Sequence, residues 1–183
     1  MTSENGPADA QAWSERARVL RRLGKLGEAQ QAAERAIEQE PQLADAWFNL
    51  GAVLVARGET HRGIEAYRKA LDLKPDLAEA WSNLGGVLGA SGDNRGEIDA
   101  YRRALESSPR LAPVWSNLGN ALLEAGDVEG ALSACKRAVG LAPEFAEAWS
   151  NLGNALREHG EHAEAARACE RALQLRELPV GDV

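Results

Sequence analysis

Apolar and polar positions follow two periods along the chain. Within short stretches, apolar residues recur at the three-to-four-residue spacing of an amphipathic helix, as at Trp47, Leu50 and Leu54. Over longer distances the whole pattern repeats, since the tryptophans stand 34 residues apart at Trp13, Trp47, Trp81, Trp115 and Trp149. A fixed period of this length predicts a repeat array, in which each unit buries its apolar side only against its neighbours.

Each repeating unit contains two helical stretches separated by a break. In the second unit the first stretch ends near Gly58, and the second, which carries Ile64, Tyr67 and Leu71, stops before Pro75. Glycine accepts a left-handed backbone and proline cannot continue a helix, so both residues are stop signals. We therefore expect five helical hairpins, at 10–43, 44–77, 78–111, 112–145 and 146–179, with a disordered leader at 1–9 and a tail at 180–183.

Three positions inside the expected core need comment. Cys135 and Cys169 hold the same place in consecutive units, where stacked helices lie about 8 to 10 Å apart, too far for a disulfide. We expect two reduced thiols that act as small core residues. Glu97 stands where the other units have alanine or glycine. Because a bare buried charge is too costly, we expect either a shifted helix start or a partner such as Arg62 or Arg95.

Charge and composition exclude several classes of function. The net charge is −7, whereas neutralising phosphates requires clustered lysine and arginine, so we expect no nucleic-acid partner. Neither a signal-peptide pattern nor a run of about 18 apolar residues is visible, so we expect no membrane span and a cytoplasmic location.

Candidate chemistry is sparse. The best metal-ligand pattern is His159-x-x-His162 with Cys169 seven residues later. Its members face different ways on two helices and a turn, and we interpret the histidines as solvated turn residues. No phosphate loop, nucleophile elbow or dinucleotide motif occurs. We predict a non-enzymatic protein without cofactor or metal.

The units resemble the tetratricopeptide repeat family. The third unit carries the signature of that family at Trp81, Leu84, Gly85, Tyr101 and Pro109. The resemblance implies an all-α fold, a right-handed α-α superhelix of five antiparallel hairpins whose first helices line a concave groove. Departures from the pattern are leucine in place of the usual tyrosine of the first helix, and cysteine in place of the later aromatic residue in the last two units.

The family geometry places a row of asparagines in the groove. Asparagine offers a donor and an acceptor, so such a row could bind the backbone of an extended peptide; it could equally stabilise the hairpins. Gly86 and Gly89 suggest a lowered groove floor beside an apolar wall of Phe48 and Val55, or simply relaxed drift on a tolerant helix. The predicted partner-binding residues are Asn49, Asn83, Asn117, Asn120, Asn151, Asn154, Phe48, Ser82, Ser116 and Ser150.

The charge of the groove indicates the kind of partner. The lysines with which some family members grip acidic chain ends are absent, and Asp45, Glu79 and Glu147 line the rim instead. This favours a neutral or basic extended segment of a protein or peptide. In the first helix Arg16 replaces the usual leucine; it caps the array or, alternatively, marks a docking spot for an acidic partner.

The predicted function is a protein-protein interaction scaffold. One alternative is the substrate-docking region of a larger glycosyltransferase, because the WSNLGNAL units resemble the repeats of protein O-GlcNAc transferases. Another is a self-assembling module, a homo-oligomer that stacks through its uncapped last helix.

Overall fold

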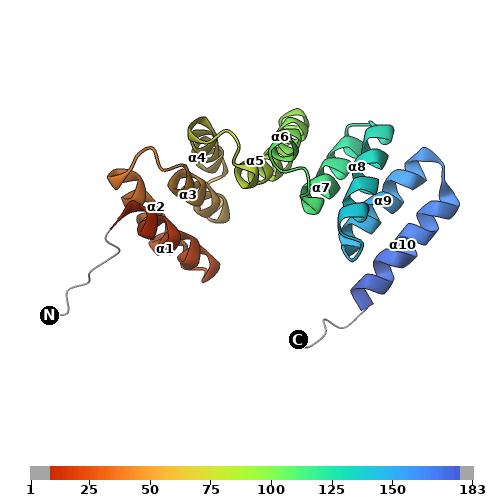
Figure 1. Ribbon diagram of the computed structural model, residues 1–183, viewed down its shortest axis with the longest axis horizontal. Helices are drawn as coiled ribbons and strands as arrows, with labels where there is room; N and C mark the ends of the chain where they lie inside the picture. The colour runs from red at the N-terminus through yellow and green to blue at the C-terminus, as the bar shows by residue number, and fades with distance from the viewer. Residues whose placement is uncertain (1–8, 178–183) are drawn as a thin grey trace. The chain divides into compact units, whose positions relative to one another are not determined.

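The structure is a computed structural model that describes residues 9–177, and in this range the chain is built from α-helices joined by short turns (Figure 1). The helices are α1 (Ala10–Arg22), α2 (Leu26–Gln39), α3 (Ala44–Ala56), α4 (Thr60–Leu73), α5 (Ala78–Ala90), α6 (Asn94–Ser107), α7 (Ala112–Glu124), α8 (Val128–Leu141), α9 (Ala146–His159) and α10 (His162–Glu177). The predicted all-α class is confirmed. Except for Asp9, the predicted leader lies outside the described residues, as does the tail at 180–183.

The helix ends follow the stop signals in the sequence. A glycine with positive φ follows each odd-numbered helix, at Gly24, Gly58, Gly92, Gly126 and Gly160. Such φ values strain any residue with a Cβ atom, which explains the choice of glycine there. Asp9 caps the start of α1, where its side chain accepts a hydrogen bond of 2.7 Å from the backbone N–H of Ala12.

The chain divides into two compact units, Met1–Leu88 and Gly89–Val183. In the first unit α1 packs against α2 and α3, and α3 packs against α2 and α4. In the second unit α7 packs against α6, α8 and α9, and α9 packs against α8 and α10. In this way α1, α3, α7 and α9 each contact their hairpin partner and a helix of an adjoining hairpin, as expected for an array whose neighbours supply one another's core.

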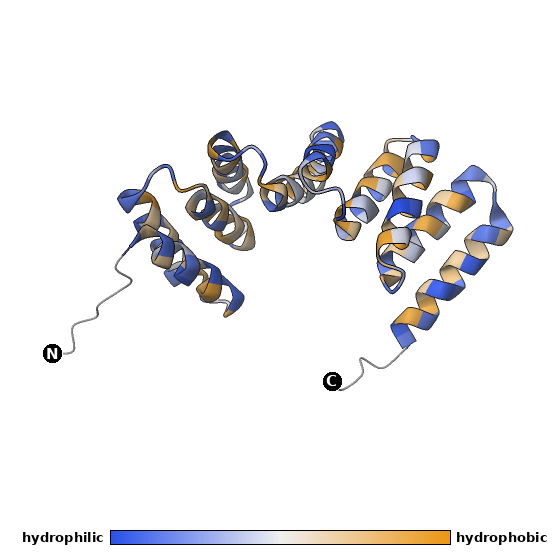
Figure 2. Cartoon of the chain, in the orientation of Figure 1, coloured by the Kyte–Doolittle hydropathy of each residue, from blue (hydrophilic) through white to orange (hydrophobic). Residues whose placement is uncertain are grey.

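Small residues let the paired helices approach closely. Ala17, Ala29 and Ala36 are fully buried in the core of the first unit, beside larger residues such as Leu54. Gly51 faces Tyr67 so closely that a Cβ atom at that position would lie 2.7 Å from the ring. Hydrophilic residues occupy the outer sides of the helices, and Figure 2 shows both kinds alternating along α10.

The signature tryptophans connect successive hairpins. The indole N–H of each donates to a proline carbonyl in the preceding turn, at 2.8 to 2.9 Å, in the pairs Trp47–Pro41, Trp81–Pro75, Trp115–Pro109 and Trp149–Pro143. Trp13 differs, because its ring is flanked by the guanidinium groups of Arg16, at 5.2 Å, and Arg35, at 4.8 Å. Arg16 is exposed there, as expected for a cap.

The two cysteines occupy different environments, which corrects one expectation. Cys135 is buried, as predicted, and both thiols are free. Cys169 is exposed and is therefore not a core residue. The reason is that α9 packs over α8, whereas within the described range no further helix follows α10.

None of the helices within residues 9–177 combines the length and the apolar character that crossing a membrane would require.

Candidate partner-binding face

The predicted site residues lie on the odd-numbered helices. We use the term odd-helix face for the surface that they form in each unit, defined by Gln11, Ser14, Asp45, Phe48, Asn49, Glu79 and Asn83 in the first unit and by Ser116, Asn117, Asn120, Ser150, Asn151 and Asn154 in the second. Asn83 and Asn120 are exposed, Asn117, Asn151 and Asn154 are half-buried, and Asn49 is buried.

Two of the asparagines bind a serine in the preceding odd-numbered helix. The Asn49 amide nitrogen donates to the backbone oxygen of Ser14 at 3.1 Å and to its hydroxyl at 2.9 Å. Asn151 makes the same pair of bonds to Ser116, at 3.4 Å and 3.0 Å. Both serines are buried, so these contacts connect neighbouring odd-numbered helices.

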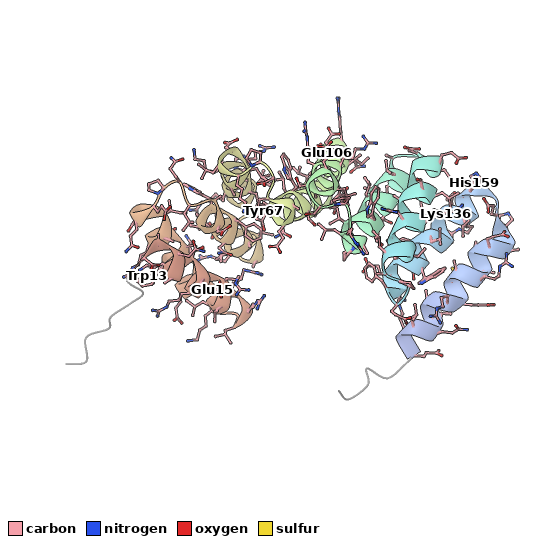
Figure 3. All side chains as sticks on the ribbon, in the orientation of Figure 1. Trp13, Glu15, Tyr67, Glu106, Lys136 and His159 are labelled. Atoms are coloured by element: carbon pink, nitrogen blue, oxygen red, sulfur yellow. The ribbon has the colours of Figure 1, made fainter. Side chains whose placement is uncertain are left out.

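Two further asparagines, Asn83 and Asn117, bind a tyrosine instead. Asn83 hydrogen-bonds the Tyr67 hydroxyl, and Asn117 hydrogen-bonds that of Tyr101. Burial raises the pKa of each tyrosine to about 12, with a further increase from Glu97 at Tyr101, against a smaller opposing effect of the asparagine bond. Tyr67, a residue of α4 that Figure 3 labels, thus connects α4 to α5.

The bond that each of these four asparagines makes varies with the residue 16 positions before it. Where that residue is Tyr67 or Tyr101, its hydroxyl reaches the asparagine; where it is Ala33 or Cys135, the asparagine turns to a serine. Ser14, Tyr67 and Tyr101 were absent from the predicted site, although the sequence carried this alternation as a signal. The asparagine row is therefore also a set of connections between hairpins.

The predicted serines and Phe48 are placed as follows. Ser116 is fully buried, whereas Ser82 and Ser150 are half-buried. The Ser150 hydroxyl accepts a hydrogen bond of 3.3 Å from Arg176 in α10. Phe48 is half-buried and packs against Tyr67, with ring centroids 6.0 Å apart.

Glu97 occupies the space that Gly89 leaves open on α5. Its helix starts at the usual place, so the expectation of a shifted start was wrong. The expected arginine partner is replaced by the Tyr101 hydroxyl, which donates to the Glu97 carboxylate. The carboxyl group lies against Gly89. Burial, together with the nearby Glu124 carboxylate, raises the pKa of Glu97, against the weaker effect of the tyrosine.

In the second unit, polar side chains also lie around Glu124. The Asn120 amide donates to the Glu124 carboxylate at 2.7 Å, one helical turn away on α7. Together with Glu97 this places two carboxylates and two asparagines, Asn117 and Asn120, on neighbouring helices. The odd-helix face of this unit is therefore rich in hydrogen-bonding groups and has two carboxylates beside it.

The first unit has a pocket of about 210 Å³ on its odd-helix face. Residues of α1 and α3 and the start of α5 line it: Gln11, Ser14, Glu15, Arg18, Asp45, Phe48, Asn49, Leu77 and Glu79. Figure 3 labels Glu15 on α1. Two of the predicted site residues, Phe48 and Asn49, therefore line a hollow, together with two of the predicted rim carboxylates.

The histidine pattern weighed as a metal site is divided between two helices, since His162 begins α10, and the interpretation of both histidines as solvated turn residues was wrong. His159 ends α9, with Nε2 at 2.9 Å from Glu129 and Nδ1 at 2.8 Å from Glu161. The bond to Glu129 raises the pKa of His159 most. Within residues 9–177 no group of three histidine, cysteine or acidic side chains is placed to hold a metal ion.

Helical hairpins connected by polar bonds between neighbours define a helical-repeat protein. A sequence profile of the tetratricopeptide repeat matches residues 3–42, 14–78, 53–112 and 116–179, and the chain therefore belongs to the tetratricopeptide repeat family. No protein of curated function matches the chain in sequence.

Solved structures share the fold at low sequence identity. A MamA chain from Desulfovibrio magneticus RS-1 is 20% identical with a TM-score of 0.83, over 96% of this chain and 99% of MamA. YrrB, a TPR protein with an unusual peptide-binding site, is 21% identical with a TM-score of 0.77, over 93% and 88%. PilF of Pseudomonas aeruginosa is 22% identical with a TM-score of 0.83, over 90% and 75%. At these identities the likeness is evidence of the fold alone.

Proposed function

We propose that this protein is an interaction scaffold, without chemistry of its own, that binds an extended peptide segment along the odd-helix face. The observation that carries the proposal is the way in which the asparagines are held. Asn49 and Asn151 use their amide nitrogen to bind the neighbouring hairpin, and Asn83 and Asn117 are held by a tyrosine hydroxyl. Each asparagine is thus oriented before any partner arrives.

An oriented asparagine suits a peptide backbone. Its side chain has two N–H donors and an oxygen with two lone pairs, and the bonds described here use only part of that capacity. Asn83 and Asn120 are exposed, and Asn117, Asn151 and Asn154 are partly so. Asn83 in the first unit, and the other four in the second, form the proposed backbone contacts of their own unit. Asn49 and Ser116 are buried and support the face from behind. Preorganisation reduces the entropy lost on binding.

The charge of the face supports a neutral or basic segment. Asp45 and Glu79 lie at the pocket of the first unit, and Glu97 and Glu124 lie near Asn117 in the second. An acidic segment would be repelled at both places, whereas a basic one would be attracted. Complementary charge of this kind mainly increases the association rate and the specificity.

The test uses peptides selected on the protein itself. Phage-displayed random peptides are selected against the full chain, and the affinity of the recovered peptides is measured by calorimetry. Replacing Asn83 and Asn117 together with alanine should weaken binding about tenfold or more, because each lost bond contributes about 0.5 to 1.5 kcal/mol. The matched control is Asn94→Ala, which changes an exposed asparagine on α6 and should leave the affinity unchanged. Equal binding by the double variant would overturn the proposal.

Self-assembly is a second candidate function, and one observation favours it. Leu173 on α10 is 56% exposed, although the corresponding residues of two internal repeats, Leu71 and Leu105, are buried. Together with the exposed Cys169 it forms an apolar strip suited to another copy of the chain. Light scattering tests this idea: concentration-dependent association that Leu173→Glu abolishes would support it, and a monomer at every concentration would refute it.

A further inference from the structure

We propose that the pocket of the first unit receives one lysine or arginine side chain of the bound segment. The inference rests on the proposed function and adds a specificity determinant to it. Three observations support it: the size and walls of the pocket, the negative charge of the pocket, and a buried oxygen without a hydrogen-bond partner.

The size of the pocket fits a single side chain. Its volume of about 210 Å³ lies below the roughly 300 to 1,000 Å³ of pockets that enclose a whole small molecule. Its walls are mixed, with Phe48 and Leu77 as apolar parts and carboxylates beside them. Long cationic side chains match this combination, because their methylene stem packs on apolar surface while the charged head meets polar groups. The Phe48 ring adds a face that attracts a cation.

The charge of the pocket is negative after internal pairing. Arg18 is the only basic residue that lines it, and its Nε atom donates to the Glu15 carboxylate at 2.8 Å. The remaining lining carboxylates are Asp45, half-buried, and Glu79, which acts on Arg18 only through its charge at longer range. Within residues 9–177 neither Asp45 nor Glu79 has a basic group within 4.0 Å. A cation from a partner would find two available carboxylates.

The third observation, a buried oxygen of Asn49, is independent of the carboxylates. Asn49 is only 5% exposed, and its amide nitrogen is used by Ser14. Its side-chain oxygen is buried and has no hydrogen-bond partner among the described residues. A buried acceptor without a donor costs about 1 to 3 kcal/mol, and an ammonium or guanidinium group carries several N–H donors. The side chain that fills the pocket therefore needs to be a donor and a cation, as lysine and arginine are.

The test uses four acetylated and amidated pentapeptides of alanine with lysine, arginine, norleucine or glutamate at the centre. Each is titrated into the full chain labelled with nitrogen-15, and the side-chain amide resonances of Asn49 are followed by NMR. We expect the lysine and arginine peptides to shift these resonances, and the norleucine and glutamate peptides to leave them in place.

Variants of the pocket test whether the shift of the Asn49 resonances arises from binding in the pocket. Asp45→Asn combined with Glu79→Gln should weaken the lysine peptide about threefold to tenfold, since exposed and partly buried ion pairs contribute about 1 kcal/mol. Glu38→Gln is the control, because Glu38 is an exposed residue of α2 outside the lining of the pocket, and it should change nothing. Thermal unfolding of all variants verifies that the fold is kept.

The outcomes separate this inference from the proposed function. If norleucine shifts Asn49 as strongly as lysine, if no peptide shifts it, or if the double variant binds lysine normally, the cationic pocket is refuted. The scaffold proposal survives these results as long as selected peptides still depend on Asn83 and Asn117. Loss of that dependence, with lysine still shifting Asn49, would refute the scaffold and keep the pocket.

Discussion

Glu97 on α6 fills the space that Gly89 leaves free on α5. The hairpin of α3 and α4 shows the reverse arrangement, because Val55 on α3 fills the space left by Gly63 on α4. Where the two helices of each of these hairpins meet, one helix contributes a side chain and the other contributes a glycine. The Gly89–Glu97 version carries a carboxyl group into the contact, where it accepts a hydrogen bond from Tyr101.

Gly89→Ala should move that carboxyl group toward solvent. The added methyl group would collide with the end of the Glu97 side chain, which is flexible and can swing away. The pKa of Glu97 should then fall toward its ordinary value, because burial is the main cause of its elevation. Stability should change by less than about 1 kcal/mol, since better helix propensity offsets the lost tyrosine bond. NMR titration of Glu97 measures the shift, and an unchanged pKa would contradict the assigned contact.

Gly119→Ala should destabilise the protein by about 1 to 3 kcal/mol through overpacking. The methyl group would collide with the sulfur of Cys135, which is buried and cannot move aside. Gly153→Ala should cost less, although its methyl group would also lie close to a sulfur, at 2.6 Å, because Cys169 is exposed and can rotate outward. Gly140→Ala on α8 is the control: nothing lies within 4 Å of the new atom. Urea unfolding should rank the three in this order, and equal losses at 119 and 153 would be inconsistent with the structure.

The two cysteines should react at very different rates. Burial raises the pKa of Cys135 to about 11, so both access and thiolate content oppose its modification. Cys169 is exposed on α10. Iodoacetamide should therefore label one thiol of the native protein and both thiols in denaturant, as counted by mass spectrometry. Rapid native labelling of Cys135 would show that the second unit opens readily. Cys169→Ser should remove the fast reaction.

His159 should make stability depend on pH near neutrality. Its pKa is raised, chiefly by the bond to Glu129 and further by Glu161, so the folded state favours the charged imidazolium. This stabilisation is complete below the ordinary histidine pKa of 6.5 and is lost as pH rises through the raised value. The melting temperature should fall slightly across that range. His159→Gln should lack this decrease, whereas His61→Gln should retain it. An identical pH profile for His159→Gln would remove the proposed role of the ion pairs.

The sequence sufficed for the architecture because every unit repeats the same local signals. Helical spacing, glycine after each odd-numbered helix and proline after the even-numbered ones recur at a fixed distance, and the helices follow these signals closely. Local rules of this kind do not depend on distant parts of the chain. The burial of Cys169 was predicted wrongly for the opposite reason. Cys169 and Cys135 hold the same position in their repeats, but burial at that position depends on a helix that follows.

The site was predicted as a set of residues but without its connections. The asparagines were recognised, whereas their anchors, Ser14 and the two tyrosines, were not. Each bond joins residues 16 or 35 positions apart, and the partner of each asparagine varies with a residue of the preceding repeat. Glu97 and Gly89 were likewise noticed separately. Comparing substitutions between equivalent places, pair by pair, would have shown both relationships.

The tryptophan bonds between hairpins bear on how such a chain can lengthen. In each case donor and acceptor lie six residues apart, as in Trp81 and Pro75, so the whole connection is encoded in one short stretch of sequence. If a gene duplication copies 34 residues and does not cut between the proline and the tryptophan, the new copy contains both partners of this hydrogen bond. Growth or shortening of the array by recombination therefore needs no compensating mutation at the junction, and the same property makes Pro109 to Trp115 a ready splice point for engineered arrays.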